Sequence, residues 1–194
     1  RSLEAAGGLK ASGRLDASDR RDGDCADLCR ARPVLMRDRF TIARARTAED
    51  LRDVARLFKR YAATLPIDLG YQGFNLEVAG LPGKYAAPEG ELFLARDTAG
   101  GAVGCVGLRP LPAEGECELK RLFILPEARG SGLGRALAEA VVAQARTLRY
   151  RRIRLDTLSS MQAALALYRG LGFQSCDAYY APTPPGTVFL SLEL

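Results

Sequence analysis

The stretch Pro-Glu-Ala-Arg-Gly-Ser-Gly-Leu-Gly-Arg at 126–135 constrains the fold of this chain most strongly. It lies between an apolar segment at 116–125 and an amphipathic segment at 132–148. Its glycines permit positive φ, so successive N–H groups can converge on one concavity in front of a helix dipole. The pattern predicts a strand, an anion-binding turn and a helix, an arrangement that suits a phosphate or a pyrophosphate.

Two familiar phosphate-binding motifs do not fit this turn. A Walker A loop ends in Gly-Lys-Ser/Thr, whereas Gly134 is followed by Arg135 and Ala136. A dinucleotide fingerprint needs glycines at its first, third and sixth positions, and the sixth position is Arg135 when counted from Gly130 or Leu137 when counted from Gly132. The pattern that remains is Arg129-x-x-Gly132-x-Gly134.

The rest of the chain divides into an unpatterned leader and a regular domain. Residues 1–35 contain no aromatic residue and are predicted to be disordered or loosely attached, with the domain spanning 36–194. Met36 is one hypothesis for the natural start, and the Cys25-x3-Cys29 pair in the leader lacks further ligands for a metal. Strands are expected at 40–46, 91–96, 102–108, 116–125, 152–156, 174–180 and 187–194, helices at 47–65, 132–148 and 161–171, and a long irregular connection at 67–90.

Composition removes several classes of function. The 194 residues favour one domain and include no histidine, which excludes imidazole bases and most zinc sites. No window approaches the ~18 apolar residues of a membrane span. Five irregularly spaced cysteines favour a reducing, cytoplasmic location. The net charge of +5 is dispersed and Trp is absent, which argues against nucleic acid as a partner.

Three motifs in order resemble the GNAT superfamily of acetyl-CoA-dependent N-acetyltransferases. Arg129–Gly134 is similar to that family's pyrophosphate-binding Arg/Gln-x-x-Gly-x-Gly/Ala loop, 118–127 to its fourth strand, and 164–173 to its Ala-x-x-Leu-Tyr-x-x-x-Gly-Phe signature. The resemblance covers about residues 40–194. It implies an α/β fold, with a central mixed sheet of about seven strands flanked by about four helices. It also implies acetyl transfer from acetyl-CoA to a primary amine of a small molecule or peptide, by direct attack in a ternary complex and without a metal.

The resemblance also implies which residues would hold the cofactor. Backbone N–H groups of the glycine-rich turn would grip the CoA pyrophosphate, arginines beside it would add positive charge, and main-chain groups of the preceding strand would pair with pantetheine. The residues concerned are Leu122, Phe123, Ile124, Arg129, Gly130, Ser131, Gly132, Leu133, Gly134 and Arg135. Core packing is an equally good explanation for the apolar side chains at 122 and 124.

Catalytic roles follow from the same resemblance. Tyr168 is the candidate general acid, because a phenol with a pKa of about 10 is protonated at neutral pH and can protonate a thiolate. The alternative interpretation is that Tyr168 is a core residue without a catalytic role. Glu118, with Glu116 two residues before it, is the candidate general base, and a strand-end ion pair is its alternative. Cys117 raises the option of a covalent acyl-enzyme, but no base for its thiol is evident.

The sequence indicates little about where the acceptor amine binds. The resemblance would place the acceptor over the 67–90 connection, where candidate walls are Asp68, Tyr71, Phe74, Glu77 and Tyr85, and acidic residues there would suit a cationic amine. Met161 stands where many relatives carry an asparagine that contacts the cofactor, and Ser160 is a candidate substitute. A non-catalytic CoA-binding sensor or interaction module is the alternative function, and a homodimer is one option for the oligomeric state.

Overall fold

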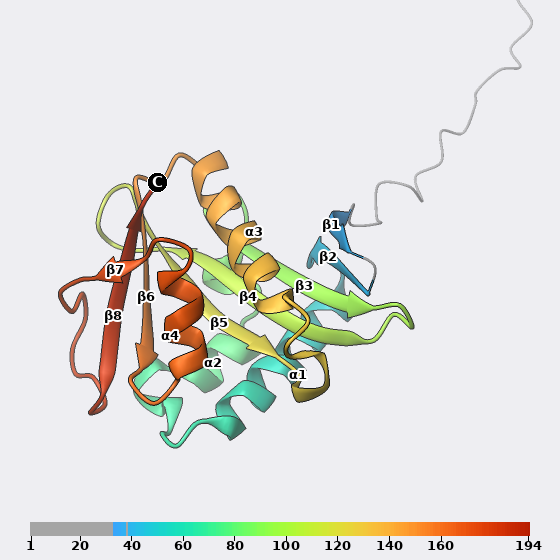
Figure 1. Ribbon diagram of the computed structural model, residues 1–194, viewed down its shortest axis with the longest axis horizontal. Coiled ribbons are helices and arrows are strands. Elements are labelled where there is room, and N and C mark those ends of the chain that lie inside the picture. Colours follow the sequence, from blue (N-terminus) through green and yellow to red (C-terminus); the bar gives the residue numbers. More distant parts are fainter. Residues whose placement is uncertain (1–32, 38) are drawn as a thin grey trace, which may run out of the picture.

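One mixed sheet forms the centre of the molecule (Figure 1). The computed structural model describes residues 33–37 and 39–194, and these supply eight strands in the order β1-β2-β3-β4-β5-β6-β8-β7. All neighbours are antiparallel except β5 and β6, which are parallel. The strands are β1 (Pro33–Arg37), β2 (Phe40–Arg44), β3 (Glu91–Asp97), β4 (Ala102–Pro110), β5 (Glu116–Ile124), β6 (Arg152–Leu158), β7 (Gln174–Ser175) and β8 (Thr187–Glu193). The expected mixed sheet is confirmed, with one strand more than the seven anticipated.

Helices cover both faces of this sheet. The α-helices are α1 (Ala48–Thr64), α2 (Phe74–Ala79), α3 (Leu133–Thr147) and α4 (Gln162–Arg169). Figure 1 shows α3 and α4 in front of the sheet. A Cβ added at Gly104 of β4 would lie 3.2 Å from Leu137 of α3, whereas one added at Gly107 would lie 2.5 Å from the Tyr85 ring. The two glycines are three residues apart on one strand, so they face opposite sides of the sheet. Helix α3 therefore covers one face and Tyr85 packs against the other.

Capping residues explain where α1 begins. The Thr47 side chain accepts a hydrogen bond from the Asp50 N–H, and the Asp50 carboxylate accepts one from the Thr47 N–H, which forms a capping box. The buried side chains of α1 are Val54, Leu57 and Phe58, spaced at three and four residues. The Phe58 ring meets the Tyr85 ring edge-on at 5.9 Å, so α1 belongs to the Tyr85 face of the sheet.

Two sequence expectations need correction. The 67–90 connection is not irregular throughout, because it holds α2 and two 3₁₀ helices, η1 (Leu69–Gln72) and η2 (Gly83–Tyr85). These helices are too short to produce a clear hydrophobic period. The strand expected at 174–180 covers only Gln174–Ser175. A third 3₁₀ helix, η3 (Pro126–Ala128), opens the glycine-rich turn.

The N-terminal part is only partly described. Strand β1 begins at Pro33, inside the segment 1–35 expected to be loosely attached, and pairs with β2. The remainder of that segment, with Cys25 and Cys29, lies outside the described residues. The boundary between a leader and the domain therefore stays a prediction, as does the proposed start at Met36.

Strands β5 and β6 separate soon after they begin. Their parallel pairing covers Glu116–Glu118 against Arg152–Arg154 only, although both strands continue well beyond it. On its other side, β5 carries a bulge where its register with β4 shifts, and Arg121 there has a φ of 60°. Because a bulge bends the strand that contains it, the second half of β5 turns away from β6. The resulting gap in the sheet opens toward the glycine-rich turn.

Candidate functional site

A cleft of about 680 Å³ lies between the end of β5 and α4, beyond the point where β5 and β6 part. The end of β5 and the glycine-rich turn form one wall, and α4 with the end of α1 forms the other. Of the residues predicted to hold a cofactor, those that line the cleft are Leu122, Phe123, Ile124, Arg129, Gly130, Gly132, Leu133, Gly134 and Arg135. The structure therefore brings nine of the ten predicted positions together, and only Ser131 is missing from the lining.

The glycine-rich turn leaves the start of α3 without a side-chain cap. Gly130 and Gly132 have φ values of 74° and 81°, a left-handed conformation that favours glycine. Gly132 is the N-cap residue, and within 33–37 and 39–194 no side chain accepts a hydrogen bond from the first N–H groups of α3. The Ser131 hydroxyl donates to the Ala128 carbonyl at 2.7 Å, so it stays within the turn. Uncapped N–H groups at a helix start are free to bind an anion.

Two arginines flank this turn. Arg129 Nε donates to the Ile124 carbonyl at 3.2 Å, which holds the side chain against the end of β5. Arg135 forms an exposed pair with Glu139, one turn further along α3, at 2.8 Å. Both side chains line the cleft, so they add positive charge at the mouth where the helix dipole already favours an anion.

A second, smaller pocket of about 70 Å³ adjoins the cleft, and we call it the inner pocket. The two cavities share Tyr61, Leu122, Met161 and Ala164. Tyr168 of α4 lines the inner pocket and is only 6% exposed. Burial raises the pKa of its phenol, with smaller contributions from Tyr61 and Asp156, so Tyr168 is protonated at neutral pH. The predicted acid thus lies in the inner pocket, which adjoins the cleft.

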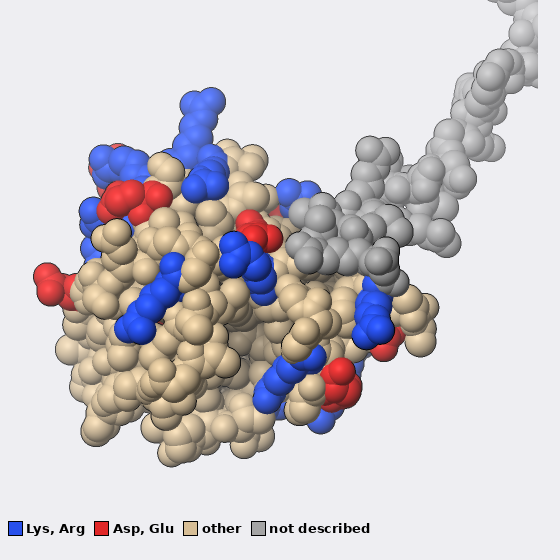
Figure 2. All heavy atoms as spheres, viewed as in Figure 1, with Lys and Arg blue, Asp and Glu red and all other residues tan. Residues whose placement is uncertain are grey.

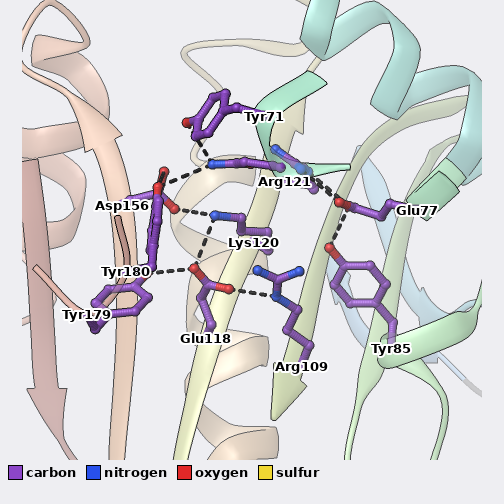
Figure 3. Close-up of polar contacts among 11 residues, drawn as sticks. Tyr71, Glu77, Tyr85, Arg109, Glu118, Lys120, Arg121, Asp156, Tyr179 and Tyr180 are labelled. Atoms are coloured by element: carbon purple, nitrogen blue, oxygen red, sulfur yellow. Dashed lines mark hydrogen bonds and ion pairs between the residues drawn. The ribbon is translucent and has the colours of Figure 1, made fainter. Parts of the chain in front are cut away.

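Glu118, the predicted base, lies beside the inner pocket but does not line it. Its side chain is fully buried and accepts hydrogen bonds from Arg109 Nε at 2.6 Å, Lys120 Nζ at 3.1 Å and the Tyr179 hydroxyl at 2.6 Å. Figure 3 shows Glu118 held between these groups. The ion-pair alternative raised for Glu118 therefore matches its surroundings, although the pair is buried rather than at an exposed strand end.

The carboxylate that does line the inner pocket is Asp156 of β6, which the sequence analysis did not select. It forms a very short ion pair with Lys120 Nζ and accepts a hydrogen bond from the Tyr180 hydroxyl at 3.0 Å. Burial raises the pKa of Asp156, but the charge and hydrogen bond of Lys120, together with Tyr180, outweigh it and leave the pKa below its ordinary value. Asp156 is therefore ionised at neutral pH.

The residues predicted for the acceptor side separate into different roles. Tyr71 lines the inner pocket and is 41% exposed, whereas Phe74 is buried beneath the Arg121 guanidinium, 5.2 Å from its ring centroid. Glu77 and Tyr85 line a third cavity of about 390 Å³ on the outer side of Arg121. Asp68 caps η1 by accepting a hydrogen bond from the Gly70 N–H.

Glu77 is not a free negative charge for a cationic acceptor. Its carboxylate accepts hydrogen bonds from Arg121 at 2.9 and 2.8 Å and from the Tyr85 hydroxyl at 2.7 Å. Burial raises its pKa, but the bonds and charge of Arg121 more than offset this and lower the pKa overall. The expectation that Glu77 attracts an amine is therefore corrected, because Arg121 already balances its charge (Figure 3).

Comparisons with known proteins match this geometry. The model of the acetyltransferase (GNAT) family matches residues 54–173. An uncharacterised N-acetyltransferase of Schizosaccharomyces pombe is 35% identical over 155 residues, covering 80% of this chain and 95% of the relative. The uncharacterised N-acetyltransferase YjgM of Escherichia coli is 32% identical over 140 residues, covering 70% and 83%.

This chain belongs to the GNAT family of acetyltransferases. A solved structure of a proposed acyl-CoA N-acyltransferase from Klebsiella pneumoniae is similar, with a TM-score of 0.63 and 31% identity over 80% of this chain and 97% of the other. A GNAT acetyltransferase from Staphylococcus aureus shares the fold, with a TM-score of 0.66 at 18% identity over 79% and 98% of the two chains. The family resemblance deduced from three motifs is confirmed.

Charge on this GNAT protein is dispersed over the face that carries the cleft. Figure 2 shows Lys and Arg side chains spread around that face and interspersed with Asp and Glu, with no continuous basic stripe. Among the described residues, no helix is long and apolar enough to cross a membrane. No group of three or more potential metal-ligating side chains occurs in the same part of the chain.

The covalent alternative at Cys117 finds little support in its surroundings. The thiol is buried beside Arg152, whose carbonyl oxygen lies 3.6 Å from Sγ. Burial first, and the charges of Glu116 and Glu118 next, raise the pKa of Cys117 to about 12. At neutral pH the thiolate is therefore scarce, and a thiol in this state is a poor nucleophile.

Sequence reasoning missed the charged residues that join β5 to its neighbours. Lys120 and Arg121 lie in a strand that is otherwise apolar from Leu119 to Ile124, and both are buried. Charged residues almost never lie fully buried without partners, so two of them inside an apolar strand are a detectable signal. The partners Asp156 and Tyr180 could not be identified in the same way, because their distances to β5 depend on where the strands separate.

Proposed function

We propose that this GNAT protein transfers the acetyl group of acetyl-CoA to a primary amine of a small molecule or peptide, in a single ternary complex. The observation that carries the proposal is the cleft between the end of β5 and α4, which runs from the start of α3 to an adjoining pocket lined by the buried Tyr168. Acetyl-CoA supplies an activated thioester to such a site. The family assignment supports acetyl transfer, and the identity of the amine remains part of the proposal.

The residues present fit coenzyme A. Gly130, Gly132, Leu133 and Gly134 line the cleft at the start of α3, and Arg129 and Arg135 supply charge beside them, which suits a diphosphate. The second half of β5 has no strand partner on the β6 side, so its backbone groups there are available to the amide groups of a pantetheine arm. Ser160 and Met161 line the same cleft, and the Ser160 side chain is the candidate replacement for the asparagine of many relatives.

Tyr168 supplies the proton that the departing thiolate needs. Its hydroxyl has no hydrogen-bond partner within the described part of the chain, so it is available to the sulfur atom. Its raised pKa keeps the phenol protonated at neutral pH. A positioned acid of this kind contributes about 10²- to 10⁴-fold to the rate. The amine must also lose a proton before it attacks, and the candidates to receive it are Asp156, which lines the inner pocket, and Glu118, which shares Lys120 with it.

The experiment is thiol release from acetyl-CoA in the presence of a panel of primary amines, with the acetylated product identified by mass spectrometry. Turnover of at least one amine, dependent on both substrates, is the expected result. Saturable stabilisation of the fold by CoA without turnover of any amine would instead favour a non-catalytic CoA sensor. Absence of both stabilisation and turnover would overturn the assignment of the cleft to CoA.

A further inference from the structure

The two carboxylates beside Lys120 are placed differently with respect to the gap in the sheet. The last residues that pair across β5 and β6 are Glu118 and Arg154. Lys120 and Asp156 come two residues later on each strand, on the same faces, where the strands have already parted. Their ion pair therefore bridges the gap at its narrow end, whereas Glu118 lies within the paired region.

Access to the inner pocket also distinguishes them. The side chain of Asp156 is 15% exposed and lines the inner pocket together with Tyr168, whereas that of Glu118 is 0% exposed and lines none of the three cavities. Glu118 also neutralises two cations, Arg109 and Lys120. Asp156 shares Lys120 with Glu118 and, in the part of the chain that the structure describes, otherwise accepts one hydrogen bond, from the Tyr180 hydroxyl.

Gln72 adds an independent sign that a hydrogen-bond donor belongs in this pocket. Its Nε2 group donates to the hydroxyls of Tyr71 at 2.8 Å and Tyr180 at 3.2 Å. Its Oε1 atom is buried and has no partner among the described residues. A buried acceptor without a donor is unfavourable, and an N–H group of a bound amine would satisfy it. Gln72 lines the inner pocket with Asp156 and also lines the third cavity.

We propose that Asp156 is the catalytic residue that receives the proton of the acceptor amine, and that Glu118 is a positioning residue that acts on Asp156 through Lys120. This inference rests on the proposed function and assigns the base within it. The inner pocket holds about 70 Å³, which is room for an amino group and a few attached atoms. The remainder of the acceptor then lies outside the pocket, beyond Tyr71, which is the exposed member of its lining.

The proton and bond changes balance as follows. The acceptor ammonium gives one proton to Asp156, and the neutral nitrogen forms a bond to the thioester carbonyl carbon. As the carbon–sulfur bond breaks, the thiolate takes the Tyr168 phenol proton, and the second proton of the attacking nitrogen returns to the Tyr168 oxygen. Asp156 releases its proton to solvent on the side of Tyr180, which is partly exposed. Each turnover thus yields one amide, one thiol and one proton.

The test compares Asp156→Asn with wild type on two acceptors of the same skeleton, one an alkylamine and the other a hydrazide. The alkylamine is protonated at pH 7 and needs a base, whereas the hydrazide is already neutral. We expect kcat for the alkylamine to fall about 100-fold or more, and kcat for the hydrazide to fall less than about 5-fold. Structural damage to the pocket would lower both equally, so an equal loss would overturn the assignment.

Matched variants separate Asp156 from its neighbours. Asp53→Asn removes a carboxylate of α1 that pairs with Arg56 of the same helix and with Arg96 of β3, and it should leave both activities unchanged. Glu118→Gln should lower both activities to a similar degree, because it displaces Lys120 and Asp156 without removing the base. A selective loss on the alkylamine in Glu118→Gln, with no selectivity in Asp156→Asn, would assign the base to Glu118 instead.

If the wild-type protein does not turn over the hydrazide, a second measurement tests the assignment of Asp156. Formate added to Asp156→Ala should restore alkylamine turnover at least 10-fold, because a free carboxylate can occupy the place beside Lys120. No restoration in a variant that still shows CoA-dependent thermal stabilisation would count against the proposal. Failure of the proposed function is distinguishable, because the wild-type protein would then turn over no amine at all.

Discussion

The ion pair between Arg121 and Glu77 ties the helices of the 67–90 segment to β5, and we expect its loss to destabilise the protein strongly. The side chains are 3% and 11% exposed and share two hydrogen bonds of 2.9 and 2.8 Å. Removing one member of a buried pair leaves an uncompensated charge, which costs about 3–5 kcal/mol. A glutamine keeps the shape of the side chain and can still accept one hydrogen bond. The loss in unfolding free energy for Glu77→Gln should therefore lie near the lower end of this range, at about 3 kcal/mol.

Chemical denaturation with urea measures this difference as a change in the free energy of unfolding. The matched control is Glu139→Gln, which removes the same group from an Arg135 pair whose side chains are 52% and 42% exposed. Exposed pairs four residues apart contribute about 0.3–0.5 kcal/mol. A loss below about 1 kcal/mol for Glu77→Gln, or an equal loss in the two variants, would refute the argument from burial.

The pH dependence of the same variant gives a second check with a defined sign. The folded-state pKa of Glu77 lies below its ordinary value of 4.5, so its contribution to stability is complete above that value. As the pH falls through the lowered pKa, wild type loses this contribution and Glu77→Gln does not. The difference between the two unfolding free energies should therefore shrink in acid, and a difference that stays constant down to pH 2 would contradict it.

Three further predictions concern the cleft. Tyr168→Phe should lower kcat by about 100-fold with little change in the Kd of CoA, as measured by thiol release and calorimetry, and an unchanged kcat would remove its role as acid. Gly132→Ala should weaken CoA binding, because the φ of 81° at residue 132 is strained for alanine. The control is Gly100→Ala in the β3–β4 hairpin, where φ is 84°. That variant should lose about 1 kcal/mol of stability and bind CoA as tightly as wild type. Cys117→Ala should retain turnover, and mass spectrometry should find no acetylated enzyme intermediate in wild type; an acetylated Cys117 would restore the covalent route.

Sequence reasoning identified the elements whose signals are local. The glycines at 130–134 specify a turn by their conformational freedom, and the apolar period of α3 is long enough to be recognised. The capping residue Thr47 marks the start of α1 for the same reason. The resemblance to the GNAT family, rather than a local signal, selected Tyr168, which lines the pocket that adjoins the cleft.

What sequence reasoning could not supply depends on distances between strands. Whether Glu118 or Asp156 faces the inner pocket is decided by the point at which β5 and β6 part, and no single strand encodes that point. The bulge at Arg121 contributes to it, because it alters the direction of β5 relative to its neighbour. The partners of Glu77 were equally hidden, since Arg121 lies 44 residues away in the chain.

The early parting of β5 and β6 also bears on how the molecule deforms. Among the described strands, β1–β5 and β6–β8 are joined within the sheet by three registered residue pairs, fewer than at any other junction except β7–β8, so we expect this seam to be compliant. A ligand bound in the opening would contact both parts of the sheet and restrict their relative motion. Amide hydrogen exchange along the seam should then slow on ligand binding more than exchange in the β3–β4 hairpin, which has no such interruption.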